Sequence, residues 1–559
     1  MAVQYPSPPT SPTYTATAYP SSHQHHQHHR GRSRFRPSLP VLVLLLSHAF
    51  LFLYYQRRDS SLSSSSSSSS PSCLSSSSSP SSSASQQSPS LASSTFSPLD
   101  PVSPTQSCEL CHLDPSNPLC EYGEDNIRLS RAYEGSGYRL RRALQKALRG
   151  EEVGVGVIGA SITQGHGLPD HINQVWHHRF FEDFNKLFPK AKLHVAAVGA
   201  MDSHFFAYCF PSLLPSDLDI YVLELDINNH AALDQLRDDD TLMRALLQLP
   251  QEPAVLRVSA FAVLFDELAQ GIVSSLTTSA FFDIPVIGVR NFLLPHVIHH
   301  RDVAEELFGM DPWNNRDYRH MSQHAHQALG DMLALFMRKE VCETKRRASL
   351  PPPPKLPQTG PWPTGEDLGK IPPLAIWSSW LHPKPLTPVH PMCQTAVSPF
   401  SPMKPYSHSS TFKLLEWNGK AAWSSSRPGS QIRFRFEGTR VGVFVWASNG
   451  GNKEEQAEDV KVRRENAPGS ALCWVEEFGL SEEEWERRLE AMDEGEGEEA
   501  EPLQSRMVNS HQPQRAAAGP DFIEIAEDLH YGEHILACEV QSQTSSGGFK
   551  WRVMGVASQ

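Results

Sequence analysis

The segment Val153–Gly165 (Val-Gly-Val-Gly-Val-Ile-Gly-Ala-Ser-Ile-Thr-Gln-Gly) constrains the fold of this chain more than any other stretch. Its apolar, β-branched residues end in a turn of small residues that carries Ser161. Buried parallel strands have this composition, and their carboxyl ends form the edge where ligands of open α/β folds bind. A phosphate-binding turn is the alternative, but the pattern Gly-x-x-x-x-Gly-Lys-Ser/Thr is absent. Ser161 is therefore a candidate nucleophile that needs a base.

A candidate base lies near residue 320. The run Asp317-Tyr-Arg-His320 places a carboxylate three residues before a histidine, at the start of a helix expected over 321–337. A serine attacks well when a base takes its proton, and a carboxylate that fixes the tautomer of a histidine makes that base effective. The chain contains 26 histidines, so a chance pair on the surface is the competing interpretation.

Four short blocks, taken in their order along the chain, resemble those of the SGNH (GDSL-like) hydrolase superfamily. The blocks are Gly159-Ala160-Ser161, Gly199, Asn228 and Asp317-x-x-His320. The resemblance implies that Ser161 attacks an ester and that His320, oriented by Asp317, is the base. It also implies that Gly199 and Asn228 complete an oxyanion hole, and that the reaction needs no cofactor and no metal.

Two blocks depart from the family pattern. The Asp of Gly-Asp-Ser is replaced by Ala160, and the Gly-x-Asn-Asp block reads Asp226-Ile-Asn228-Asn229. Both changes alter hydrogen bonding around the serine, so a catalytically inactive descendant that binds or assembles glycans is the alternative. An α/β-hydrolase is disfavoured, because Thr163 occupies the second glycine position of Gly-x-Ser-x-Gly.

Strand and helix patterns alternate through the middle of the chain. Apolar runs predict strands over 153–160, 192–198, 219–225, 254–263 and 284–289. Apolar residues at helical spacing predict helices over 136–149, 173–188, 241–249 and 321–337. Such alternation favours a parallel sheet with right-handed crossovers. Together with the resemblance, it predicts a flavodoxin-like three-layer SGNH hydrolase domain over 150–342, with its site residues on one sheet edge.

The first hundred residues do not have the composition of a folded domain. We expect a disordered cytoplasmic tail over 1–36, a transmembrane anchor over 37–56 and a serine-rich disordered stalk over 57–107. More arginines precede the anchor than follow it, which favours a type II orientation with a luminal catalytic region. A cleaved signal peptide is the alternative, but the apolar run starts late and no small-residue cleavage site follows it.

Cysteines mark the end of the stalk. Cys108, Cys111 and Cys120 open a lead-in segment over 108–149. A Cys-x-x-Cys pair binds zinc in some proteins, but no second pair accompanies it here. In an oxidising lumen we expect a local disulfide among these three cysteines. We expect Cys209 to be a buried free thiol.

A second domain follows a proline-rich linker over 343–373. Short runs of alternating apolar and polar residues between 431 and 556 predict a C-terminal β-sandwich, jelly-roll-like, over 374–559. It resembles the accessory domain of some carbohydrate esterases, which implies a structural or glycan-docking role. Cys473 and Cys538 are expected to bridge two of its strands. An acidic run at about 476–501 is expected to be a disordered insertion.

Charge and domain order limit the classes of function that we expect for this chain. The acidic insertion supplies much of the net charge of −13, and no basic domain or recognised motif indicates nucleic-acid binding. A lipase would need an exposed apolar patch near the serine, and the sequence shows none. The whole arrangement resembles fungal type II membrane proteins related to capsule-associated proteins. This implies an O-acyl esterase or acyl transferase that acts on a polysaccharide or glycoprotein glycan in the Golgi, the secretory pathway or at the cell surface. The oligomeric state is not indicated.

Overall fold

The computed structural model describes residues 102–265, 268–311, 313–351, 360–361, 367–383, 386, 391–417, 419–451, 460–477, 504–514 and 518–559. All of them belong to one compact unit, Ser93–Gln559. The predicted tail and membrane anchor, and most of the stalk and of the acidic insertion, lie outside the described residues. Glu476 and Glu477, at the predicted start of the insertion, instead end a β-strand, so the expected boundary at 476 is wrong. Within the described residues, no helix is both long enough and apolar enough to cross a membrane.

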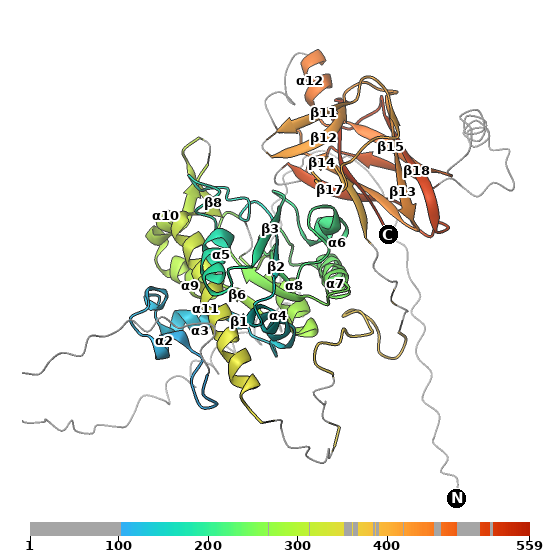
Figure 1. Ribbon diagram of the computed structural model, residues 1–559. Helices are drawn as coiled ribbons and strands as arrows, with labels where there is room; N and C mark the ends of the chain where they lie inside the picture. The colour runs from blue at the N-terminus through green and yellow to red at the C-terminus, as the bar shows by residue number, and fades with distance from the viewer. Residues whose placement is uncertain are drawn as a thin grey trace, which may run out of the picture. The chain divides into compact units, whose positions relative to one another are not determined.

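A six-stranded sheet forms the centre of the first half of this unit (Figure 1). Its strands are β1 (Arg131–Tyr133), β2 (Gly154–Gly159), β3 (Lys192–Ala197), β4 (Ile220–Glu224), β5 (Ala254–Ser259) and β6 (Val286–Gly288). They run in the order β1-β6-β5-β4-β2-β3, with β2 to β6 parallel and β1 antiparallel at one edge. Because β2 lies between β3 and β4, the chain leaves the first parallel strand to one side and returns on the other. Ligands of doubly wound sheets bind at this point.

Helices cover both faces of the sheet (Figure 1). One face carries α4 (Tyr138–Leu148), α5 (Trp176–Leu187) and α11 (Gln323–Ala348), and the other carries α6 (Ser203–Cys209), α7 (Leu233–Leu247) and α8 (Ile272–Phe282). The shorter helices are α2 (Leu110–Leu113), α3 (Glu124–Leu129), α9 (Arg290–His299), α10 (Ala304–Leu307), η1 (Pro118–Cys120), η2 (Phe210–Ser212) and η3 (Arg301–Val303). The apolar sides of α4 and α5 are buried against the sheet, as their sequence spacing requires. Helix α8 differs, because it buries mainly serine and threonine side chains and leaves Val273 and Leu276 exposed.

Three of the predicted elements need correction. Helix α11 continues to Ala348 rather than ending at 337. Helix α7 begins at Leu233 rather than at 241, because two acidic residues in its first turns are buried with arginine partners. Asp239 accepts from Arg257 at 2.6 Å, and Asp240 accepts from Arg244 at 2.7 Å. The segment around His320 does not begin a helix. It forms strand β8 (Arg316–Met321), which pairs with β7 (Phe308–Met310) in a two-stranded sheet.

Two antiparallel sheets form the second half of the unit, and they enclose a single apolar core. One sheet contains β10 (Ser407–His408), β13 (Gln431–Gly438), β18 (Gly532–Val540), β15 (Ser470–Glu477) and β16 (Ser505–Asn509). The other contains β11 (Lys413–Trp417), β12 (Lys420–Ser425), β19 (Trp551–Ser558), β14 (Val441–Ala447) and β17 (Gly519–Ala526), with β9 (Met392–Thr395) beside β19. A short helix, α12 (Val460–Asn466), precedes β15. We call this pair of sheets the sandwich.

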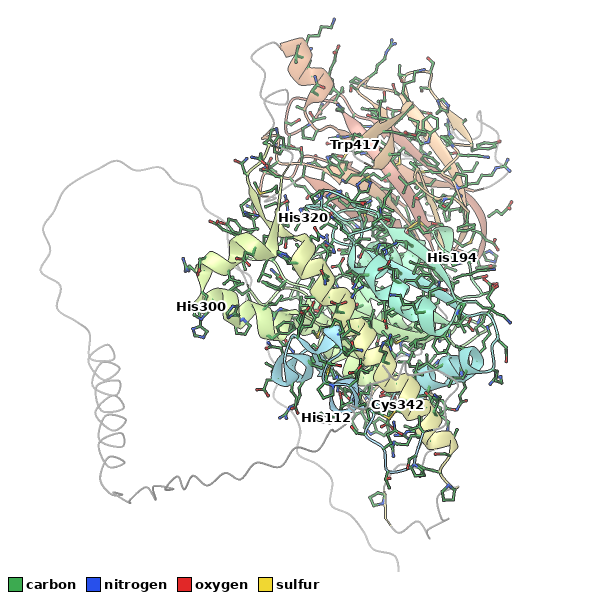
Figure 2. All side chains as sticks on the ribbon, turned by 60° about the vertical axis from the view of Figure 1, so that its left-hand side comes forward. His112, His194, His300, His320, Cys342 and Trp417 are labelled. Carbon is green, nitrogen blue, oxygen red and sulfur yellow. A yellow bond between two sulfur atoms is a disulfide. The ribbon has the colours of Figure 1, made fainter. Side chains whose placement is uncertain are left out.

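The described cysteines form four disulfides: two join distant parts of the fold, one is local and one links neighbouring strands. The pairs are Cys108–Cys342, Cys111–Cys120, Cys209–Cys393 and Cys473–Cys538. The expectation of a free thiol at Cys209 is wrong, because the sandwich supplies its partner from β9. Cys108 does not pair locally but reaches Cys342 on α11, which Figure 2 labels. The ninth cysteine, Cys73, lies outside the described residues.

Helix α6 joins the α/β part to the sandwich through aromatic contacts. Phe205 meets Phe444 of β14 with ring centroids 5.0 Å apart, and Tyr208 stacks on Phe522 of β17 at 5.4 Å. The buried residues of α6 share one apolar cluster with a few residues of the sandwich, namely Cys393, Ala422, Phe444, Met554 and Ala557. The Cys209–Cys393 disulfide crosses the same contact. The two halves are therefore held together by burial as well as by a covalent bond.

We predict that this disulfide contributes more stability than the local one. In the chain-entropy account, closing a loop of 184 residues stabilises by about 5 kcal/mol, whereas closing one of 9 residues stabilises by about 3 kcal/mol. The double variant Cys209→Ala/Cys393→Ala should therefore lose more thermal stability than Cys111→Ala/Cys120→Ala. Scanning calorimetry of the two proteins checks this. Equal losses would contradict it.

Candidate active site

Ser161, His320 and Asp317 form a hydrogen-bonded series at the carboxyl edge of the central sheet. The Ser161 hydroxyl lies 2.8 Å from Nε2 of His320, and Nδ1 of His320 lies 2.5 Å from Oδ2 of Asp317. A carboxylate only accepts hydrogen bonds, so Nδ1 carries the proton and Nε2 is left to accept from the serine. Figure 2 labels His320 at its position on β8. The arrangement has the geometry of a nucleophile, a base and an orienting group.

Hydrogen bonds with buried polar groups fix the turn that carries Ser161. Ser161 follows β2 by two residues, and a Cβ at Gly159 would stand 2.0 Å from the hydroxyl oxygen of Thr163, so only glycine fits there. The Thr163 hydroxyl donates to Oε2 of Glu224 at 3.0 Å. Nε2 of His177 donates to the Thr163 carbonyl at 3.0 Å. These contacts hold the nucleophile turn against the end of β4.

A close approach of two glycines brings the base to the serine. Gly167, in the nucleophile turn, has φ of +87°, and a Cβ there would stand 3.0 Å from the Cβ of His320. A Cβ at Gly309 of β7 would stand 2.3 Å from the Gly167 carbonyl oxygen. The hairpin of β7 and β8 therefore packs directly on the nucleophile turn. His320 reaches Ser161 because neither glycine carries a side chain.

The two residues expected to bind an oxyanion follow the strands on either side of β2. Gly199 comes after β3 and Asn228 after β4, so both lie beside the turn of Ser161. Within the described part of the chain, neither the N–H of Ser161, nor the N–H of Gly199, nor the side-chain amide of Asn228 donates a hydrogen bond. Three donors at one sheet edge are thus available to a developing negative charge.

The backbone around Gly199 is tightly constrained. A Cβ at this position would stand 2.6 Å from Oε1 of Gln164, whose amide nitrogen donates to the Ala197 carbonyl at 3.0 Å. The next residue, Ala200, has φ of +67°, a conformation that costs a residue with a side chain roughly 1 kcal/mol. Strain of this kind is retained where surrounding contacts fix the backbone, which is expected of a preorganised donor.

The charge state of the site follows from its surroundings. Burial would raise the pKa of Asp317, but the hydrogen bond and the charge of His320 outweigh it and lower that pKa to about 2. A second histidine, His166, meets the His320 ring edge-on at 5.2 Å. Burial first, and then the charge of His320, lowers the pKa of His166 to about 4. Asp317 is therefore ionised and His166 neutral near neutral pH.

Glu224 is a buried acidic residue of the site. It was not among the residues predicted from the sequence. Its side chain is fully buried, and burial raises its pKa to about 8. The hydrogen bond from Thr163 and the backbone amide of Ala160 favour the charged form but do not offset burial. The available signal was an acid at the end of the apolar run Ile220-Tyr-Val-Leu-Glu224. A neutral carboxyl group therefore lies under the nucleophile turn at neutral pH.

The two departures from the family pattern have structural explanations. Ala160 is fully buried, and the carboxyl group beside its amide belongs to Glu224 rather than to residue 160. Asn229 is also buried, and its Oδ1 accepts from the N–H of Ser203 at 2.9 Å, which fixes the start of α6. Neither departure breaks the series from Ser161 to Asp317.

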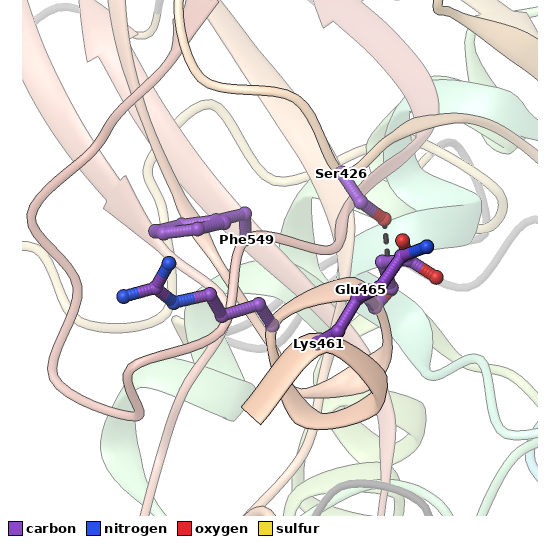
Figure 3. Close-up of a pocket in the computed structure, with 5 residues that line it drawn as sticks. Ser426, Lys461, Glu465 and Phe549 are labelled. Atoms are coloured by element: carbon purple, nitrogen blue, oxygen red, sulfur yellow. Dashed lines mark hydrogen bonds between the residues drawn. The ribbon is translucent and has the colours of Figure 1, made fainter. Parts of the chain in front are cut away.

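Among the described residues, one other serine hydroxyl, that of Ser545, pairs with a histidine ring, Nδ1 of His511 at 2.8 Å, but no carboxylate orients this histidine. In the described ranges, no three His, Cys, Asp or Glu side chains are grouped to hold a metal ion. A hollow in the sandwich is lined by Ser426, Lys461, Arg464, Glu465 and Phe549 (Figure 3). There the Ser426 hydroxyl donates to the Glu465 carbonyl at 2.8 Å. No histidine lines this hollow, so it contains no base for its serine.

Comparison with known proteins bears on the fold. No protein-family model matches the chain, and no curated protein matches it. The chain is similar to a two-domain esterase active on acetylated mannans, crystallised with mannopentaose, with 17% identity over 77% of this chain and 97% of that chain and a TM-score of 0.50. A second structure of a two-domain esterase active on acetylated mannans matches with 16% identity, 77% and 98% coverage and a TM-score of 0.50. At these identities the likeness concerns the fold, which is that of a two-domain carbohydrate esterase.

We predict that Glu224→Gln gains stability over the wild type as the pH rises. The folded protein holds the Glu224 proton up to about pH 8, above the usual range of the unfolded chain, so wild-type stability falls between about pH 4.5 and 8. Glutamine does not titrate, and its carbonyl oxygen still accepts from Thr163. The difference in melting temperature between variant and wild type should therefore move in favour of the variant from pH 5 to pH 9.

Glu224→Ala is the control for packing. It removes the acceptor of Thr163 and leaves a cavity, so it should melt below the wild type throughout this pH range. A difference between Glu224→Gln and the wild type that does not change with pH would rule out a neutral Glu224.

Proposed function

We propose that this chain is an SGNH-type serine esterase or acyl transferase that acts on O-acyl groups, acetyl in the simplest case, of a polysaccharide or glycoprotein glycan. The observation that carries the proposal is the hydrogen-bonded series from Ser161 through His320 to Asp317. The fold likeness to esterases of two-domain architecture supports it.

The geometry leads to a two-step reaction. Nε2 of His320 takes the hydroxyl proton as Oγ of Ser161 attacks the ester carbonyl carbon. The tetrahedral intermediate collapses when the bond to the sugar oxygen breaks, and His320 returns the proton to that oxygen. The acyl group is then carried on Ser161. Water releases it in a hydrolase, and a second sugar hydroxyl accepts it in a transferase.

The remaining residues stabilise charges that appear during these steps. Asp317 is ionised and accepts from Nδ1–H, so it stabilises the imidazolium that forms when His320 takes the proton. The N–H groups of Ser161 and Gly199 and the amide of Asn228 are proposed to bind the oxyanion. Preorganised donors of this kind contribute roughly 3 kcal/mol each.

The same proposal includes the substrate class and the cellular location of the protein. The similar esterase is active on acetylated mannans, which supports an acylated glycan as the substrate of this chain. We propose that the apolar segment at 37–56 anchors the protein in a membrane as a type II protein. The catalytic part would then face the lumen of the secretory pathway or the cell exterior. Ala160 and Asn229 favour, as the second candidate, an inactive glycan-binding or assembly factor.

Ser161→Ala distinguishes the two candidates. Full-length wild-type protein should hydrolyse p-nitrophenyl acetate and bind a fluorophosphonate probe covalently. In the variant, labelling should disappear and kcat/KM should fall by at least about 10³-fold, because the attacking oxygen is removed. The exposed Ser116 provides the control Ser116→Ala, which should keep both activities. Absent labelling of the wild type, or equal turnover by Ser161→Ala, would favour the inactive factor.

Asn228→Ala tests the proposed oxyanion donors. Loss of one preorganised donor should lower kcat by about 10²- to 10³-fold with little change in KM, because the contact is made mainly in the transition state. Steady-state kinetics on the acetate reporter measures this. Asn126→Ala, at an exposed position on α3, is the matched control and should leave kcat unchanged. An effect confined to KM would remove Asn228 from the oxyanion hole.

A further inference from the structure

One turn of the sandwich reaches the nucleophile edge of the α/β part. The turn joins β11 to β12 and brings Lys420 close to Gly199, in the loop after β3 that is proposed to bind the oxyanion and is called the oxyanion loop below. A Cβ at Gly199 would stand 3.6 Å from Nζ of Lys420, and a Cβ at Gly419 would stand 3.8 Å from Nε2 of Gln164. The sandwich therefore supplies part of the wall around Ser161, in addition to any structural role.

The Lys420 ammonium has no anionic partner among the described residues. None of them forms an ion pair with it, and Nζ lies 5.7 Å from the ring centroid of Trp446. Lys420 is half-buried, and burial lowers its pKa. A partly desolvated ammonium without a carboxylate is unfavourable unless a ligand supplies the opposite charge.

The other charged groups around the serine do not supply that charge. Asp317 is the carboxylate of the catalytic series, and its Oδ2 already accepts from His320. Arg319 adds a second cation, with Nε 3.8 Å from Oδ1 of Asp317. Burial is the main cause of the low pKa of the neighbouring His166; the charges of His320, Lys420 and Arg319 lower this pKa further, and Asp317 alone raises it. The edge beside Ser161 is therefore electropositive.

We propose that Lys420 binds an anionic group, a carboxylate or a phosphate, that the glycan carries close to the ester attacked by Ser161. This rests on the proposed esterase function and specifies its substrate class as an acidic glycan. The ammonium lies beside the oxyanion loop, so the anion belongs to the same sugar as the acyl group or to its neighbour. The Trp446 ring offers an apolar surface next to it.

Three matched substrates test the proposal with full-length protein. They are O-acetylated methyl glucosides that differ only at C6, which is a hydroxymethyl group in the first, a carboxylate in the second and a phosphorylated hydroxymethyl group in the third. The wild type should show a kcat/KM at least tenfold higher for one of the two anionic substrates than for the neutral one. The carboxylate and phosphate arms identify which anion is preferred. This preference should decrease as salt is added, because ions screen the contact.

Substitution of Lys420 tests whether this residue causes the preference for anionic substrates. Lys420→Met keeps most of the side-chain volume but removes the charge, so the ratio of anionic to neutral kcat/KM should fall towards one. Lys420→Arg should retain a ratio above one. Lys413→Met is the matched control, because Lys413 is an exposed lysine on the same hairpin, and it should keep the wild-type ratio.

The outcomes separate this inference from the proposed function. Ser161-dependent hydrolysis of all three substrates at equal rates would leave the esterase function intact and overturn the role of Lys420. A preference that survives Lys420→Met, or an equal loss of kcat on all three substrates, would also overturn it. If none of the substrates is hydrolysed and Ser161 is not labelled, the proposed function itself fails.

Discussion

The hydrogen-bonded register of β2 with its two neighbours is the constraint on which the site depends. Gly159 pairs with Ala197 of β3 and with Glu224 of β4, so the three strands end at the same level. The turns that follow therefore lie side by side. A shift of two residues in either pairing would move Gly199 or Asn228 by about 7 Å relative to Ser161. Preorganisation of the oxyanion donors is thus a property of the sheet rather than of any one loop.

The parts of this arrangement that depend on local pattern could be predicted from the sequence. The strand before Ser161, the carboxylate three residues before His320 and most sheet strands carry a local signal, because burial fixes their composition. Contacts between residues that lie far apart in the sequence left no local signal in it. The partner of Cys209 lies 184 residues away, and the placement of His320 on a strand depends on the approach of Gly167 to Gly309. Lys420 begins β12, a short and mostly buried strand whose sequence shows no alternation of apolar and polar residues.

Two buried titratable side chains that hold the turn of Ser161 are neutral. Near pH 7 Glu224 keeps its proton, whereas His177 has lost its own, since burial lowers its pKa to about 4. The charged groups recorded near His320 are Asp317, Arg319 and Lys420. A low-dielectric environment strengthens the interactions of each of them.

The disulfide between Cys209 and Cys393 gives the chain a closed covalent ring. The ring contains α7, β5, β6, the β7–β8 hairpin, α11 and the segment that leads to the sandwich. A protease that cuts anywhere inside it produces a nicked protein, not two fragments. The base on β8 and the lysine on β12 would stay tethered after such a cut. Only a reducing environment would release them.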